Sequence, residues 1–179
     1  MPFDPDARKV RIPPGELHGR LNSAGWTWYV ELCAAELSSL RVSDPGAFRV
    51  LVGLMETAAE SGLPASWNGD GYRVPVGDRV GRRDFGRRDM PWLGELRVDE
   101  RTPKKPSRPG NAREHRLYFG EPDVPTDLVL GSGVGTKRGQ ESHVGSKQTA
   151  QMKQAMWAII RWCEEAIPPT TWRVWNWNC

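Results

Sequence analysis

Short stretches in which hydrophobic and polar residues alternate mark the candidate strands of this chain. The alternation has the period of two residues that is typical of a strand with one buried face. It is clearest in WTWYVEL (26–32), WLGELRVDE (92–100) and REHRLYF (113–119). LVLGSGVG (128–135) is more uniformly apolar, which predicts a more buried strand. The pattern therefore predicts four main strands, three of them in the second half of the chain.

The strand over 113–119 has a cation in the middle of its polar side. Leu117 and Phe119 define the apolar side, which also carries His115, and Arg116 lies on the opposite side. We therefore expect the imidazole to serve structure and the guanidinium to lie on an open face of the sheet. Judged by side-chain pKa alone, His115 would be the candidate for catalysis and Arg116 would not.

Two longer segments have the periodicity of amphipathic helices. The first covers 43–62, where Ser43 or Asp44 can cap the start and Pro45 suits the first turn. The second covers 146–167 and is followed by two prolines, which end a helix. Between the first strand and the first of these helices, ELCAAELSSL mixes both periods, so a strand-to-helix transition falls there.

Turn residues separate the remaining elements. Prolines in RTPKKPSRPGNA (101–112) exclude a central strand or a helix and predict a basic hairpin loop. Residues 63–91 are rich in Gly, Arg and Asp and predict loops with a short strand piece around 72–76. The expected fold is α+β: an antiparallel meander sheet packed on one face by two N-terminal helices and a C-terminal helix. The other face of the sheet is expected to stay open.

The same pattern divides the chain into three parts. Residues 1–25 are proline-rich and charged and form an N-terminal extension, 26–165 form the domain, and 166–179 form a tail. The tail could pack against the domain, dock a partner or stack on nucleic-acid bases, and packing is the role that we rank first. The tail carries three tryptophans: Trp172, Trp175 and Trp177.

Composition narrows the class of protein. The chain has 179 residues, 38% of them hydrophobic, and no apolar run of transmembrane length. Its beginning lacks the apolar stretch of a signal peptide. Its cysteines, Cys33, Cys163 and Cys179, are odd in number and far apart, which suggests neither a disulfide framework nor a zinc site. We therefore expect a cytoplasmic protein without a metal or other cofactor and without membrane contact.

The charge is unevenly distributed. The formal net charge is only +3, but residues 79–116 contain twelve basic and six acidic side chains. A basic patch attracts phosphate groups, and arginine, which dominates here, can grip two phosphate oxygens at once. Solubility is the alternative explanation for these charges.

The order of four motifs resembles the RelE/ParE toxin superfamily, in its HigB-like or phage-derived branch. The motifs are a GELR strand (94–97), an EHRLYF strand (114–119), an apolar strand that ends in GTKR (135–138), and a helix that opens KQTAQ (147–151). The resemblance covers roughly residues 26–165 and rests on the order and spacing of the motifs together.

The resemblance implies the toxin of a type II toxin–antitoxin pair. Members of this kind act as metal-free endoribonucleases that cut mRNA on the ribosome and block translation. The 2′-hydroxyl attacks the neighbouring phosphate and leaves a cyclic phosphate. The implied partners are the ribosome, mRNA and a cognate antitoxin, expected to be a small helix-turn-helix protein.

Residues in the matching motifs are the candidates for this chemistry. The resemblance implies that Arg116 and Arg97 hold the phosphate, and that Lys137 orients the phosphate or acts as an acid. Glu95 is a candidate base, or a partner of the two arginines. His143 is a candidate acid in the loop before the last helix. Solvated strand and turn residues are the alternative explanation for all three cations.

Further basic residues are candidates for contacts with ribosomal RNA, since such contacts are directed at the phosphate backbone. They are Arg138, Arg82, Arg83, Arg87, Arg88, Lys104, Lys105 and Arg108.

Two alternative functions remain open at this point. The first is a member of the fold that acts by binding alone, such as a gyrase poison or a partner-docking protein. It is favoured by the terminal extensions and by Met152, which stands where some relatives of this kind carry a tyrosine. The second is a structural phage or accessory protein, which is suggested only by the unusual termini.

Overall fold

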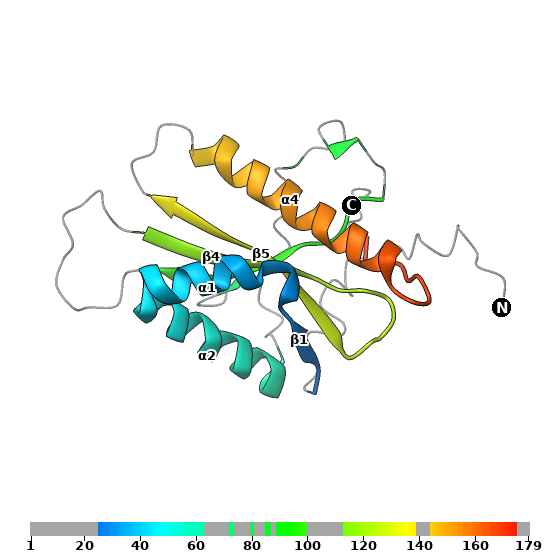
Figure 1. Cartoon of the computed structure of the whole chain (residues 1–179), viewed down its shortest axis with the longest axis horizontal. Coiled ribbons are helices and arrows are strands. Elements are labelled where there is room, and N and C mark those ends of the chain that lie inside the picture. The colour runs from blue at the N-terminus through cyan, green and yellow to red at the C-terminus, as the bar shows by residue number, and fades with distance from the viewer. Residues whose placement is uncertain are drawn as a thin grey trace.

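The computed structural model describes residues 25–62, 72–73, 80, 85–86, 89–99, 113–138 and 144–174. Figure 1 shows the arrangement of the elements. In chain order they are β1 (Thr27–Tyr29), the 3-10 helix η2 (Glu31–Cys33), α1 (Ala34–Ser43), α2 (Pro45–Ser61), β2 (Tyr72–Arg73), β3 (Gly94–Asp99), β4 (Arg113–Gly120), β5 (Leu128–Arg138) and α4 (Val144–Glu165).

The described strands form one mixed sheet in the order β1-β5-β4-β3-β2. Neighbouring strands from β2 to β5 are antiparallel, but β1 pairs with β5 in parallel, with Thr27 opposite Leu128. The α+β class is therefore confirmed, whereas a purely antiparallel meander is wrong. The helical pair α1–α2 follows β1 and takes the chain away from it, so β1 joins no hairpin and pairs with the distant β5.

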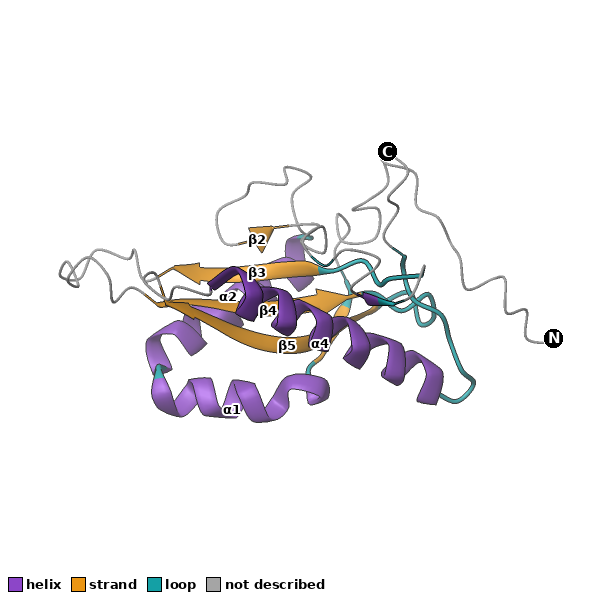
Figure 2. Cartoon of the chain, turned by 90° about the horizontal axis from the view of Figure 1, so that it is seen from above, coloured by secondary structure: helices purple, strands orange, loops and turns teal. Residues whose placement is uncertain are grey.

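Helices cover both faces of this sheet. In Figures 1 and 2, α1 and α2 lie on one face and α4 lies on the other. The prediction that all helices share one face and leave the other open is wrong. The reason is that the second face of the sheet is also apolar: Leu93 just before β3, Tyr118 on β4 and Leu130 on β5 form a layer with the buried side of α4. Leaving that layer uncovered would expose a large apolar surface to water.

Local signals lie at both ends of α2, and of the two predicted N-cap candidates the structure uses Asp44. Asp44 is the N-cap, and its Oδ1 accepts a hydrogen bond of 3.0 Å from the backbone N–H of Ala47. Pro45 occupies the first turn, where a missing N–H costs nothing. Gly62 ends the helix with a φ of 75°, a conformation that side chains disfavour.

Two cysteines lie in the two apolar cores. Cys33 packs under α1 and α2, and Cys163 packs under the end of α4. Both are free thiols, and burial raises the pKa of each to about 12, so neither is a reactive thiolate at neutral pH.

The beginning of the tail is part of the fold, which supports packing as its role. Trp172 is fully buried, and its indole Nε1 donates to the carbonyl oxygen of Asp89 at 2.8 Å. Arg173 lies over the ring of Trp92 and forms a buried ion pair of 2.6 Å with Glu121. Trp175 and Trp177, like the extension before residue 25, lie outside the described residues. Among the helices that are described, none is long and apolar enough to cross a membrane.

Candidate functional site

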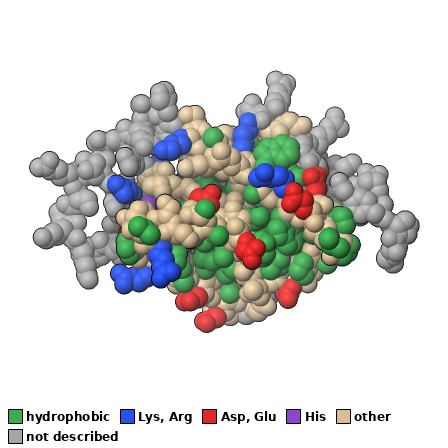
Figure 3. Space-filling model, in the orientation of Figure 1, with side chains coloured by type: hydrophobic (Ala, Val, Ile, Leu, Met, Phe, Trp, Pro, Cys, Tyr) green, Lys and Arg blue, Asp and Glu red, His purple; other side chains and the backbone are tan. Residues whose placement is uncertain are grey.

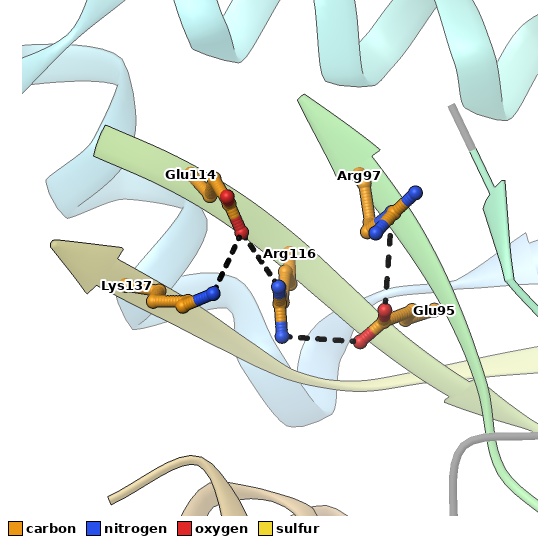
Figure 4. Close-up of polar contacts among 5 residues, drawn as sticks. All are labelled: Glu95, Arg97, Glu114, Arg116 and Lys137. Carbon is orange, nitrogen blue, oxygen red and sulfur yellow. Dashed lines mark hydrogen bonds and ion pairs between the residues drawn. The ribbon is translucent and has the colours of Figure 1, made fainter. Parts of the chain in front are cut away.

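Three neighbouring strands bring five charged side chains together on the α4 face of the sheet. Figure 4 shows them: Glu95 and Arg97 on β3, Glu114 and Arg116 on β4, and Lys137 on β5. The register places Arg97 opposite Arg116 and Glu114 opposite Lys137. We call these five residues the charged cluster.

A β-bulge in β5 decides that Lys137 belongs to this cluster. Tyr118 pairs with Gly133 and the next residue, Phe119, pairs with Gly131, so Ser132 is the extra residue. The hydroxyl of Ser132 donates to the carbonyl oxygen of Tyr118 at 3.2 Å. Because strand side chains alternate, one extra residue moves Lys137 from one face of the sheet to the other.

The cluster is a chain of ion pairs with Arg116 in its middle. Arg116 Nη2 donates to Glu114 Oε2 at 2.6 Å, and Arg116 Nη1 lies 3.7 Å from Glu95 Oε2. The cations on either side complete the chain: Arg97 Nε lies 3.9 Å from Glu95 Oε1, and Lys137 Nζ lies 3.7 Å from Glu114 Oε2. Two carboxylates therefore hold three cations.

Arg116 is buried, which corrects the prediction that it lies on an open face. Only 5% of its surface is exposed, and only 1% of Glu95. Helix α4 covers this part of the sheet. It can approach closely because residue 135, which pairs with Arg116, is a glycine, and a Cβ there would meet the amide of Gln151 on α4 at 2.5 Å.

The other members of the cluster reach the surface. About a third of the side chain is exposed in Arg97 (31%), Lys137 (33%) and Glu114 (31%). A bound molecule can therefore contact these three side chains directly, while Arg116 and Glu95 lie beneath them. Glu114 is not among the candidate residues named from the sequence. Its position two residues before Arg116, on the same strand face, is the signal that could have found it.

The charges in the cluster shift the pKa values of its members. Partial burial raises the pKa of Glu114, but the hydrogen bond and charge of Arg116, with the charges of Lys137 and Arg97, outweigh this and hold it below its ordinary value. Burial, followed by the negative charge of Glu95, raises the pKa of Tyr118 to about 12. Glu114 is therefore ionised at neutral pH and the phenol of Tyr118 is not.

The opposite face of the sheet holds His115, as predicted. It is 3% exposed, and its ring nitrogens lie 3.0 Å from Thr136 Oγ1 and 3.3 Å from Asp44 Oδ2. Asp44 is also the N-cap of α2, so the imidazole ties the junction of α1 and α2 to the sheet. The sequence pattern placed His115 in the core but did not reveal this partner, which lies 71 residues away.

Several predicted site residues cannot be placed. For Arg138, the backbone belongs to β5, but its side chain is not among those described. The remaining candidates lie outside the described residues: His143, Arg82, Arg83, Arg87, Arg88, Lys104, Lys105 and Arg108.

The described His, Cys, Asp and Glu side chains form no group of three or more that could hold a metal ion. In comparisons with protein-family models, curated proteins and solved structures, no match to this chain is found.

Proposed function

We propose that this chain is the toxin of a type II toxin–antitoxin pair and that it cuts mRNA on the ribosome. The observation that carries the proposal is the charged cluster, in which a carboxylate and two cations reach the surface above a buried arginine. The resemblance of the strand and helix motifs to RelE-like toxins supplies the substrate. A cognate antitoxin, the ribosome and mRNA are the proposed partners.

The two exposed cations are the proposed phosphate ligands. Arg97 Nε lies 3.9 Å from Glu95 Oε1, too far for a hydrogen bond, so Glu95 holds Arg97 only loosely. Because 31% of the Arg97 side chain is exposed, a phosphate can reach it from the surface. Lys137, at 3.7 Å from Glu114, is likewise held loosely. Together they would stabilise the charge that develops on the phosphate in the transition state.

Glu114 is the proposed base. Its carboxylate takes the proton of the 2′-hydroxyl, the 2′-oxygen forms a bond to phosphorus, and the bond from phosphorus to the 5′-oxygen breaks. Lys137 gives a proton to the leaving oxygen, so the products are a cyclic phosphate and a 5′-hydroxyl. The lowered pKa of Glu114 keeps it ionised and also makes it a weak base, which predicts slow chemistry.

Arg116 and Glu95 have positioning roles in this proposal. Arg116 holds Glu114 by the 2.6 Å hydrogen bond, and Glu95 holds Arg116 and Arg97 from below. Both are too buried to contact a nucleotide directly. This differs from the direct phosphate contact that the sequence resemblance implies for Arg116.

A second function, binding without catalysis, is favoured by one specific observation. Both terminal nitrogens of Arg116 already face carboxylates, as expected for an arginine that stabilises the fold. In that case the cluster would shape a docking surface for a partner such as gyrase, and no bond would be cut.

Cleavage assays with purified protein distinguish the two functions. We expect the parent chain to cut mRNA on programmed ribosomes, and Glu114→Gln to lower the rate about 100-fold or more. Glutamine keeps an acceptor for Arg116, so the fold should survive, which circular dichroism checks. Arg49→Gln on α2 is the control, because it removes an exposed cation on the opposite face.

The proposal fails if Glu114→Gln cuts RNA as fast as the parent. A parent chain that leaves mRNA intact but inhibits DNA supercoiling by gyrase would favour the binding function instead.

A further inference from the structure

A polar groove runs beside the charged cluster, between α4, β5 and the start of α1. Its volume is about 350 Å³, which is at the lower end of the range for ligand pockets. Figure 3 looks onto the face of the molecule that carries α1 and α4 and shows acidic and basic side chains interspersed there. The groove therefore suits a small, uncharged polar group better than a chain segment or a phosphate.

Small residues create the space. Residue 133 on β5 is a glycine, and a Cβ there would meet the methyl group of Ala155 on α4 at 3.7 Å. Ala158, one turn further along α4, also lines the groove. Longer side chains at these three positions would fill it. These small residues keep side-chain bulk out of the groove.

Hydrogen-bonding side chains stand along the rim at helical spacing. Gln151, Gln154 and Arg161 project from one side of α4, and Glu36 projects from α1. The formal charges of Glu36 and Arg161 cancel. Amide side chains offer both donors and acceptors, and a carboxylate accepts from the N–H groups of a base while it repels a phosphate.

The groove and the charged cluster have neighbours in common. Tyr118, which lies on the same strand face as Arg116 and is influenced by its charge, lines the groove. Gln151 also lines it, and its amide lies over Gly135, the residue that pairs with Arg116. A nucleotide whose phosphate lies at Lys137 and Arg97 could therefore direct a base along α4 into the groove.

We propose that the groove between α4 and β5 binds one nucleobase of the RNA strand that the charged cluster contacts. The inference rests on the proposed function for its substrate class. It adds a subsite for base recognition, formed by Gln151, Gln154, Arg161 and Glu36.

Binding of a trinucleotide that cannot be cut tests this subsite apart from catalysis. The probe is a fluorescent 2′-O-methyl RNA trinucleotide, compared with versions in which the base at one position is absent. We expect removal of one of the three bases to weaken binding to the full chain about tenfold or more. Gln154→Leu and Arg161→Gln should weaken binding of the complete probe but not of the probe lacking that base.

Arg49→Gln is the matched control for the loss of one arginine charge, because it lies on α2 away from the groove. Equal affinity for all probes, or equal losses with Arg161→Gln and Arg49→Gln, would overturn the base subsite. A parent chain that shows the expected base dependence but cuts no unmodified RNA would sink the nuclease proposal and leave the subsite standing.

Discussion

The burial of Arg116 changes the chemistry of every residue around it. A guanidinium in the interior is stable only when carboxylates and hydrogen bonds replace its water, and Glu95 and Glu114 supply them. The desolvation of Arg116 lowers its pKa, but the charge of Glu95, the charge that Tyr118 carries once it ionises at high pH, and the hydrogen bond and charge of Glu114 more than compensate, so its pKa lies above the ordinary value. Arg116 is therefore a permanent cation on which the exposed part of the cluster is built.

Stability should depend on the protonation of Glu114. Its pKa is lower in the folded chain than its ordinary value of 4.5, so its contribution to folding is fully present above that value. The contribution is lost as the pH falls through the pKa of the folded state. We expect the urea midpoint of the parent to fall more than that of Glu114→Gln between neutral and acidic pH, and the two curves to converge at low pH.

Glu56→Gln is the control, because Glu56 is exposed on α2. Parallel curves for the parent and Glu114→Gln over the whole range would contradict the ion pairs described for this carboxylate.

The fit between α4 and the sheet depends on glycines in β4 and β5. Gly120, Gly133 and Gly135 lie under α4 and let it approach the strands. This contact fixes the height of α4 above the charged cluster. The absence of a side chain at Gly133 also leaves the groove open beside Ala155. The position of α4 and the groove therefore both depend on glycines.

Alanine substitutions at two of these glycines should have different effects. A Cβ at Gly120 would overlap Ile159 Cδ1 and approach the Trp92 carbonyl oxygen to 3.2 Å, so Gly120→Ala forces the buried Ile159 side chain, α4 or the strand to shift. We expect it to lower the free energy of unfolding by about 1–3 kcal/mol in urea denaturation. Gly133→Ala is the matched control, because its Cβ would make only an ordinary contact of 3.7 Å with Ala155. Equal losses at both positions would show that strand propensity, and not packing under α4, determines the result.

At the scale of the whole molecule, two apolar layers enclose the sheet and the tail closes one of them. The layer under α4 includes Trp172, which comes after the helix in sequence and packs near Met90 and Leu93 before β3. Isolated β-bridges join Trp172 to Pro122, just after β4, and Val174 to Pro91, just before β3. The domain therefore extends beyond the predicted boundary at residue 165.

Substitutions of two tryptophans measure how much this closure contributes. Trp172 is fully buried, whereas Trp157 on α4 is 39% exposed and stacks on Phe85. We expect Trp172→Ala to lower the free energy of unfolding by about 3–5 kcal/mol, and Trp157→Ala to lower it much less. Chemical denaturation followed by circular dichroism provides the comparison. If Trp172→Ala were as stable as Trp157→Ala, the tail would not belong to the core.

Local signals in the sequence determined the elements and the sides of the strands. Asp44 and Pro45 start α2 as predicted and Gly62 ends it, because capping depends on neighbouring residues alone. The alternation in 113–119 placed His115 with Leu117 and Phe119 on one side and Arg116 on the other. In 92–100 the same alternation separates Glu95 and Arg97 from Leu96 and Val98.

Only the tertiary structure decided what covers that face and which residues meet on it. The parallel pairing of β1 with β5, the position of α4 over Arg116 and the contact between His115 and Asp44 join residues that are far apart in the chain. No local pattern encodes them, because they follow from how all the apolar surfaces are buried at once. The bulge at Ser132 was also decided by the tertiary structure. A strand pattern alone does not show where one extra residue moves the following side chains to the other face of the sheet.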